Sequence, residues 1–182
     1  MRIIAGTYKG RLLKVPDSKF VRPTTDKLKG VIFNYLSNVI DFDGINVCDI
    51  YAGSGSLGLE ALSRGADKIH FVEKNYSIYK ILSQNIQTLN VEGNSKIFKM
   101  EAVRFSKISL HDRYDLIIAD PPFFKDDIHL VVKNLIEREY LNKGGILIIE
   151  RSIQTEKKDV DNFGIQPFKR IGDSLLYQYI KE

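Results

Sequence analysis

The sequence predicts an α/β fold in which a doubly wound, mostly parallel sheet is covered by helices on both faces. From Ile45 to about residue 150, short apolar segments alternate with helical ones, which favours parallel strands joined by right-handed crossovers. A glycine-rich string follows the first of these strands, as in nucleotide-binding sheets. Near the C-terminus, two strand-like segments flank Gly172-Asp173-Ser174 too closely for a helix, which predicts an antiparallel hairpin. Together these features predict a seven-stranded sheet.

The main domain is expected to span residues 24–182. Thr24 or Thr25 should cap its first helix, with Asp26 in the first turn, and apolar residues continue at helical spacing as far as Val39. Beyond it, strand-like and helical segments alternate. We expect strands at 45–50, 68–73, 96–100, 114–119 and 146–150, helices at about 56–64, 75–90, 101–109 and 126–138, and a final hairpin of 163–171 and 175–180.

Residues 1–23 form a basic arm in front of this domain. Two short apolar runs on either side of Lys9-Gly10 predict a small β-hairpin. Residues 1–30 hold eight basic and two acidic side chains, a net charge of +6, whereas the whole chain carries +4 and residues 31–182 therefore −2. A basic segment on a mildly acidic body favours a polyanionic partner over a merely solvated terminus. The cations expected to hold nucleic-acid phosphates are Arg2, Lys9, Arg11 and Arg22.

The composition excludes several classes of protein. With 182 residues, 43% hydrophobic and 27% charged, the chain is long enough for one globular domain with a real core. A single cysteine, Cys48, and three scattered histidines argue against a disulfide and a structural zinc site. The apolar runs are too short to span a bilayer, and the N-terminus does not resemble a secretory signal. We expect a cytoplasmic monomer that binds neither metal nor membrane.

The most informative string is Asp120-Pro121-Pro122-Phe123, which directly follows the apolar strand 114–119. Consecutive prolines fix the backbone and remove two N–H donors, so the turn presents carbonyl oxygens to whatever lies above it. Asp120 adds a carboxylate acceptor, and Phe123 adds a flat face on which a base can stack. These groups suit a planar amino group, and we expect all four residues to form a catalytic turn.

A glycine-rich loop follows the first strand of the main sheet. Gly53, Gly55 and Gly58 match G-x-G-x-x-G, in which glycine lets the backbone approach a ligand and turn tightly into a helix. The motif alone fits either a nicotinamide cofactor or S-adenosylmethionine. Two details favour the sulfonium cofactor. Asp49 places a carboxylate at the strand end, where a methionyl ammonium would neutralise it, and hydride transfer has no use for the Asp120 turn.

Two further acids follow the next two strands. Glu73 ends the second strand, 20 residues after Gly53, where an acid typically accepts hydrogen bonds from ribose hydroxyls. Glu101 follows the third strand and could lie near an adenine edge, although a helix-capping role fits equally well. The expected cofactor site comprises Thr25, Asp49, Tyr51, Ala52, Gly53, Ser54, Gly55, Glu73, Lys74, Glu101, Ala102 and Asp120.

These motifs together resemble class I S-adenosylmethionine-dependent methyltransferases, which have a Rossmann-like fold. More narrowly, the chain resembles the small bacterial 16S ribosomal RNA guanine-N2 methyltransferases of the RsmD type. The acidic turn alone is shared with many amino-group methyltransferases, but the Arg-Pro-Thr-Thr-Asp string and the Ala-Gly-Ser-Gly block are specific when found together. The resemblance spans nearly the whole chain and is carried by residues 2–6, 22–26, 49–65, 71–73, 120–123 and 172–174.

The resemblance implies methyl transfer from S-adenosylmethionine to the exocyclic N2 of a specific guanine of 16S ribosomal RNA, in a loop near the P site. The 30S subunit or a late assembly intermediate would present that base. Three alternatives stay open: an adenine-N6 or other amino-group methyltransferase acting on RNA or DNA, a non-catalytic RNA-binding protein, and a nicotinamide-dependent reductase. A dead cofactor pocket should show erosion of Asp49, Gly53, Gly55 or Asp120, and all four are present. No separate DNA-recognition domain is visible.

Overall fold

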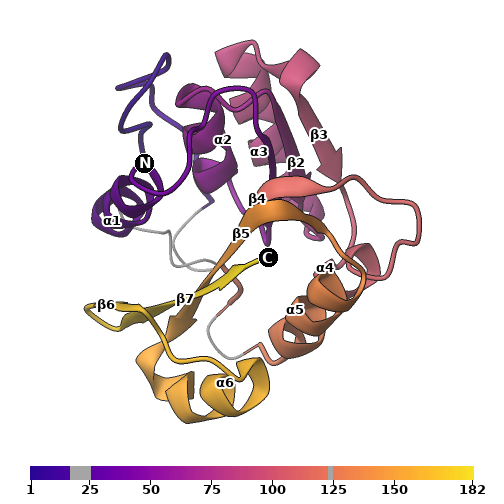
Figure 1. The fold of residues 1–182 in the computed structure, drawn as a ribbon. Coiled ribbons are helices and arrows are strands. Elements are labelled where there is room, and N and C mark those ends of the chain that lie inside the picture. The colour runs from indigo at the N-terminus through magenta and orange to yellow at the C-terminus, as the bar shows by residue number, and fades with distance from the viewer. Residues whose placement is uncertain (17–25, 123–124) are drawn as a thin grey trace.

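The computed structural model describes residues 1–16, 26–122 and 125–182 (Figure 1). Four residues singled out from the sequence, Arg22, Thr24, Thr25 and Phe123, lie outside these described ranges. The expected cap of the first helix and the stacking face of the acidic turn are therefore not placed.

A seven-stranded sheet runs through the molecule in the order β3-β2-β1-β4-β5-β7-β6. Neighbouring strands from β3 to β5 are parallel, and β7 pairs antiparallel with both β5 and β6. The predicted fold class is confirmed. The strands are β1 (Asn46–Ile50), β2 (Lys68–Val72), β3 (Ser95–Phe98), β4 (Tyr114–Ala119), β5 (Leu141–Ser152), β6 (Lys169–Ile171) and β7 (Ser174–Ile180). The helices are α1 (Asp26–Leu36), α2 (Ser56–Ser63), α3 (Tyr76–Leu89), α4 (Ala102–Phe105), α5 (Asp127–Glu137) and α6 (Glu156–Phe163), with short 3₁₀ turns at Glu92–Asn94 and Ile153–Thr155.

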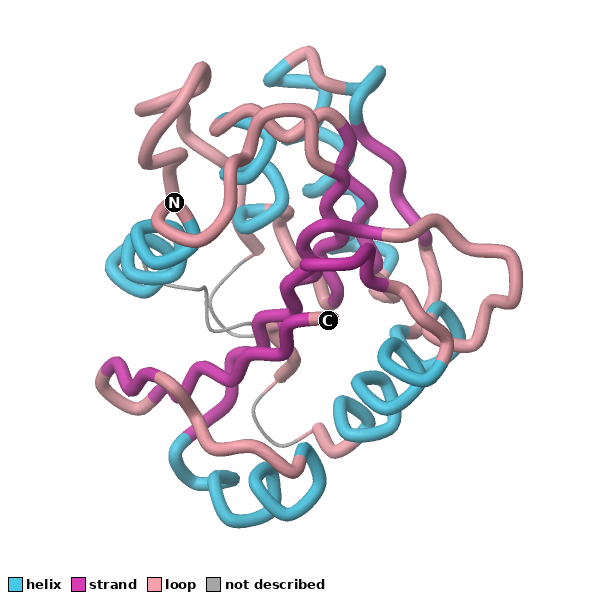
Figure 2. The backbone as a smooth tube through the Cα atoms, in the orientation of Figure 1, coloured by secondary structure: helices cyan, strands magenta, loops and turns pink. Residues whose placement is uncertain are grey.

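Successive residues of the central strands face two different apolar cores. Val47 and Ile148 belong to the core that α1, α2 and α3 cover, whereas Cys48 and Ile149 belong to the core that α4, α5 and α6 cover. The central strands carry apolar residues on both faces because a parallel sheet of this kind is covered on both sides. Figure 2 shows helices on both sides of the strands. No described helix is long and apolar enough to cross a membrane.

The strand β5 is longer than the predicted 146–150. Asn142-Lys143-Gly144-Gly145 looks like a turn in the sequence, yet the strand continues through it from Leu141, with a register shift opposite Tyr114–Leu116. A Cβ on Gly145 would lie 2.8 Å from the Asn142 carbonyl oxygen and 2.9 Å from the Tyr114 carbonyl oxygen, and Gly144 has a φ of 76°. Glycine is therefore needed here both for a local bulge of the strand and for the close approach of two backbones.

The prediction of a strand over 163–171 is wrong for most of its length. Phe163 ends the helix α6 and packs in the core, and β6 occupies only the last three residues of the range. Glu156 and Asp159 lie in the first turn of α6, and Gly164 ends it with a φ of 69°. These are ordinary start and stop signals for a helix. The apolar residues from Phe163 onward also fit a strand, which is why the helix was not predicted.

Two helices end earlier than predicted. α1 stops at Leu36, so Val39 is 47% exposed instead of lying on the buried face. α4 stops at Phe105 instead of extending to 109. The Tyr140 hydroxyl donates a hydrogen bond to the Phe105 carbonyl oxygen (2.7 Å), which replaces the helical partner of that carbonyl.

The N-terminal residues 1–16 lie against the main domain. The Ile3 amide donates to the Arg11 carbonyl (3.0 Å) and the Gly10 amide to the Ile3 carbonyl (2.9 Å), which gives a hairpin too short for two regular strands. Ile3 and Leu13 are buried in the core beside α1. The arm is thus part of the folded body. Its predicted boundary at residue 23 falls between described ranges and stays a prediction.

Candidate active site

A cavity of about 650 Å³ opens at the carboxyl ends of the parallel strands, on both sides of the point between β1 and β4 where strand order reverses. Such switch points are where doubly wound sheets bind ligands, and the volume suits a cofactor. Most of the predicted site residues lie on its wall. Those among the described residues are Asp49, Tyr51, Ala52, Gly53, Ser54, Glu73, Lys74, Ala102, Asp120, Pro121 and Pro122.

The glycine loop forms one wall of this cavity. Gly53 has a φ of 56°, and Tyr51 O, at 3.9 Å, is the one atom of the described residues within 4 Å of a Cβ built there, so a ligand can approach its backbone. Gly55 behaves differently from the prediction. It does not line the cavity, and a Cβ on it would lie 2.3 Å from Leu82 Cδ1. Gly55 therefore lets α2 pack closely on the sheet and α3, and supports the site from beneath.

Asp49 is the most buried acid of the cavity wall, with 1% of its surface exposed. Its Oδ2 accepts a hydrogen bond from the Gly58 amide (2.8 Å). Burial raises the pKa of Asp49 well above its usual value. The Gly58 bond opposes this shift, and the nearby carboxylates of Asp120 and Glu73 add to it. A cationic group in the cavity would relieve both the desolvation and the repulsion.

Glu73 lies at the end of β2 and connects two loops. Its Oε2 accepts from the Gly53 amide (3.1 Å), and its Oε1 accepts from the Asn75 amide (2.7 Å). Asn75 in turn caps α3 by accepting from the Ser77 and Ile78 amides. These bonds hold the carboxylate at the rim, and each oxygen keeps a second lone pair that can accept a ribose hydroxyl.

The position of Glu101 differs from the expectation for a cofactor contact. It is exposed, does not line the cavity and pairs with Lys74 (3.4 Å). It is the N-cap residue of α4, but its side chain makes no capping hydrogen bond. Ala102, the next residue, does line the cavity and leaves space for a flat ligand beside it.

The acidic turn is fixed to the glycine loop by two residues that the sequence did not single out. The Lys125 amide donates to the Pro122 carbonyl (2.9 Å), and the Lys125 ammonium binds Asp127 Oδ2 (2.7 Å). Asp127 Oδ1 accepts from the Tyr51 hydroxyl (3.0 Å). Burial would lower the pKa of Lys125, but the hydrogen bond to Asp127 and its charge raise it, so Lys125 stays a cation. The turn and the loop are thereby held as one unit.

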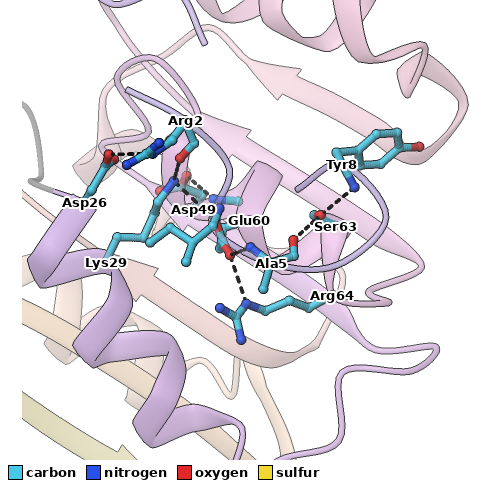
Figure 3. A network of polar contacts seen from close by, with 11 residues as sticks. Arg2, Ala5, Tyr8, Asp26, Lys29, Asp49, Glu60, Ser63 and Arg64 are labelled. Atoms are coloured by element: carbon cyan, nitrogen blue, oxygen red, sulfur yellow. Dashed lines mark hydrogen bonds and ion pairs between the residues drawn. The ribbon is translucent and has the colours of Figure 1, made fainter. Parts of the chain in front are cut away.

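The arm is attached to α2 through the buried carboxylate of Glu60 and through Ser63, whose hydroxyl accepts from the Tyr8 amide (2.9 Å) and donates to the Ala5 carbonyl (2.5 Å) (Figure 3). The Ile4 and Ala5 amides donate to its two oxygens (2.8 and 3.0 Å), and both side chains of the Lys29–Glu60 ion pair (3.2 Å) have 0% exposure. The Arg64 guanidinium completes the set at 3.0 Å. Burial lowers the pKa of Lys29, and the charge of Glu60 opposes that shift.

This attachment brings the arm to the mouth of the cavity. Met1, Val15 and Pro16 line it. Arg2 is exposed and pairs with Asp26 (3.5 Å). Lys9 and Arg11 are exposed and form no ion pair within the described ranges. The predicted RNA-binding cations that can be placed are therefore solvent-accessible.

The fold and this site define the class of protein as a class I methyltransferase. A family model described as "Conserved hypothetical protein 95" matches residues 1–180, and the chain belongs to that family, the RsmD family of the predicted resemblance. The cofactor of this class is S-adenosylmethionine. The cavity size, the open Gly53 backbone and the buried Asp49 carboxylate all fit it.

Several known proteins are similar to the chain over most of its length. "Ribosomal RNA small subunit methyltransferase D" of Escherichia coli K12 is 34% identical over 185 aligned residues, covering 100% of this chain and 90% of that protein. "Putative rRNA methyltransferase YlbH" of Bacillus subtilis is 32% identical, with 86% and 85% covered. The structure of "Putative methyltransferase yhhF" from Escherichia coli superposes with a TM-score of 0.82 at 28% identity, over 100% of this chain and 98% of that one.

Proposed function

We propose that this protein methylates 16S ribosomal RNA at the exocyclic N2 of one guanine, of the guanine 966 class, in the 30S subunit or a late assembly intermediate. The observation that carries the proposal is that Asp120, Pro121 and Pro122 line the same cavity as Asp49 and Gly53. An amino-group acceptor and a cofactor loop thus meet in one space. The two rRNA methyltransferases named above support RNA as the substrate.

The chemistry follows from the groups on the wall. A guanine amino nitrogen is a poor nucleophile because its lone pair is delocalised into the ring. Hydrogen bonds from its two protons to the Asp120 carboxylate and the Pro121 carbonyl would draw that lone pair out of conjugation and fix its direction. A bound cofactor would supply an electrophilic methyl group: the N–C bond forms as the S–C bond breaks, and the amino nitrogen releases one proton to Asp120 or to water. Alignment of two bound reactants is worth up to about 7–11 kcal/mol in favourable cases.

The base must leave its stack to enter the cavity, which costs a few kcal/mol. Stacking on Phe123, the last residue of the turn, would return about 1–3 kcal/mol of that cost. The arm cations Arg2, Lys9 and Arg11, together with Arg22, would hold flanking phosphates and set the register without reading sequence. Recognition is therefore divided between the arm and the cavity.

One experiment tests this function against its rivals. The protein is incubated with tritiated S-adenosylmethionine and, in parallel, with unmethylated 30S particles, naked 16S RNA and DNA, and the modified nucleoside is identified by mass spectrometry. We expect N2-methylguanosine at one position of the small-subunit RNA. Methyladenine in RNA or DNA would replace this function with the adenine alternative. No transfer to any of the three would contradict it.

A further inference from the structure

A further carboxylate on the cavity wall, Glu150, has no part in the chemistry described so far. It ends the apolar part of β5 and is 5% exposed, yet it lines the same cavity as Asp120. In the parallel register of β4 and β5, Ile118 pairs with Ile148 and Ala119 with Ile149. Asp120 and Glu150 are the next residues along these two strands.

The alternation of the sheet places both acids on one face. Ile118 and Ile148 belong to the same core, under α1, α2 and α3, and side chains two residues further along a strand return to that face. In the order of the sheet, Asp49 is the last residue but one of β1, Asp120 follows β4 and Glu150 lies on β5. Asp120 therefore lies between Asp49, on the side of the glycine loop, and Glu150, on the opposite side.

The Gly172-Asp173-Ser174 turn holds this carboxylate in place. The Ser174 hydroxyl donates to Glu150 Oε1 (2.8 Å), and both residues are buried. All three residues of the turn line the cavity. The turn therefore presents Glu150 as an oriented acceptor on the wall of the cavity.

Guanine carries a matching pair of donors. Its N1–H lies directly beside its amino group, whereas adenine has an unprotonated N1, an acceptor, in the same position relative to its amino group. We propose that Glu150 accepts the N1–H of the target guanine while Asp120 holds the amino group, so that the pair of carboxylates selects guanine over adenine. This assignment rests on the proposed function. An adenine here would set an acceptor against a buried carboxylate, and sites built to meet a donor reject analogues that lack it strongly.

The test replaces the N1–H and the carboxylate in turn. A small-subunit RNA is assembled by ligation with either guanine or 2-aminopurine at the mapped target, because 2-aminopurine keeps the amino group but has no N1–H. We expect the wild-type protein to favour guanine by about 100-fold or more in kcat/KM. In Glu150→Gln, the amide N–H can donate to an unprotonated N1, and the preference should narrow by about 10-fold or more. The control Glu156→Gln, an exposed acid on α6, should leave the ratio unchanged.

The outcomes separate this inference from the function on which it rests. If the wild-type protein makes no N2-methylguanosine, the proposed function fails. If it does, but Glu150→Gln slows both substrates equally or neither, the role of Glu150 is overturned. Binding of S-adenosylmethionine within a few-fold of wild type shows that the variant is folded. Should that variant not fold, Ser174→Ala replaces it. Loss of the orienting hydroxyl should narrow the ratio several-fold, and an unchanged ratio would overturn the proposal.

Discussion

Two buried carboxylates, Glu60 on α2 and Asp49 on β1, have opposite surroundings. Glu60, with 0% exposure, receives two backbone amides and two cations, from Lys29 and Arg64. Asp49, with 1% exposure, receives the Gly58 amide alone within the described part of the chain, and two neighbouring acids raise its pKa further. Both appear in Figure 3. A carboxylate whose donors all come from the protein holds the fold together, whereas one that lacks a cation inside a cavity is prepared for a cationic ligand.

The largest expected effect is a loss of folding stability when Glu60 is replaced. Glu60→Gln keeps the shape but leaves the Lys29 ammonium buried without its counter-charge, and breaking a buried pair in this way typically costs about 3–5 kcal/mol. Urea unfolding should show a loss of that size, whereas Glu92→Gln, at an exposed acid, should change the free energy of unfolding by less than about 0.5 kcal/mol.

A second variant sharpens this prediction. Adding Lys29→Met to Glu60→Gln removes the stranded charge and should recover part of the lost stability, because buried pairs are often replaceable by neutral groups. A loss below about 1 kcal/mol in Glu60→Gln alone would mean that the arm is held mainly by its apolar residues.

The next largest effect is expected on turnover, from replacing Asp120. This residue lines the cavity and contributes to the raised pKa of Asp49. Asp120→Ala removes the acceptor of the amino group, and turnover should fall by about 10²–10³-fold, as when one preorganised hydrogen-bonding group is lost. Cofactor affinity should stay within a few-fold. Single-turnover rates and cofactor titration separate the two effects, and near-normal methylation would contradict the role of Asp120.

Replacing Asp49 should have the opposite pattern of effects to replacing Glu60: cofactor affinity should fall and folding stability should not. Asp49→Asn keeps an acceptor for the Gly58 amide and removes a charge that opposes folding, so the free energy of unfolding should stay unchanged or rise. Affinity for S-adenosylmethionine should fall by about 10–100-fold, since a hydrogen bond to a charged group is lost. Calorimetry measures both constants. 5′-Methylthioadenosine, which has no amino-acid part, should bind the variant and the wild type equally, and an equal loss for both ligands would sink the ammonium assignment.

The same residue predicts a pH dependence. Because the folded pKa of Asp49 is raised, its charge opposes folding, and stability falls as pH rises from the unfolded pKa through the folded one. Binding a cation favours the ionised form. Wild-type affinity should therefore rise with pH below the amino-group pKa of the ligand, about 7.7–8, with proton release on binding. Asp49→Asn should bind with a flat profile, and an identical slope in both proteins would rule Asp49 out as the titrating group.

The comparison also explains which parts of this molecule could be predicted from its sequence. Asp49, Gly53 and Asp120 could be singled out because each lies at or shortly after the end of an apolar strand, and parallel strands end at one edge of a sheet. The contacts between Glu60 and Lys29 could not be found, because each residue lies on a helix with ordinary polar spacing and only tertiary packing brings them together.

Other features also depend on tertiary packing. Gly55 fits the nucleotide fingerprint, and its missing Cβ makes room for Leu82; its contact with the cofactor stays a prediction. Glu150 gave a local signal, an acid at the end of an apolar strand, whose meaning depended on Ser174 from another strand. A register shift in β5 and the short α6 were concealed by glycines and apolar residues that fit two local structures equally well.

The smallest expected effect concerns the outer surface of the segment that Glu60 anchors. Arg11→Glu, alone and with Arg22→Glu, should weaken RNA binding several-fold and spare cofactor binding, because exposed phosphate contacts add affinity without shaping the cavity. Each lost contact should lower the slope of log affinity against log salt by about 0.7–0.9. The control variant Lys143→Glu makes the same change of charge at an exposed residue near the amino end of β5, far along the strand from the cavity. It should leave the salt slope unchanged. Equal slopes for Arg11→Glu and the wild type would mean that the arm only completes the core through Ile3 and Leu13 and does not hold RNA.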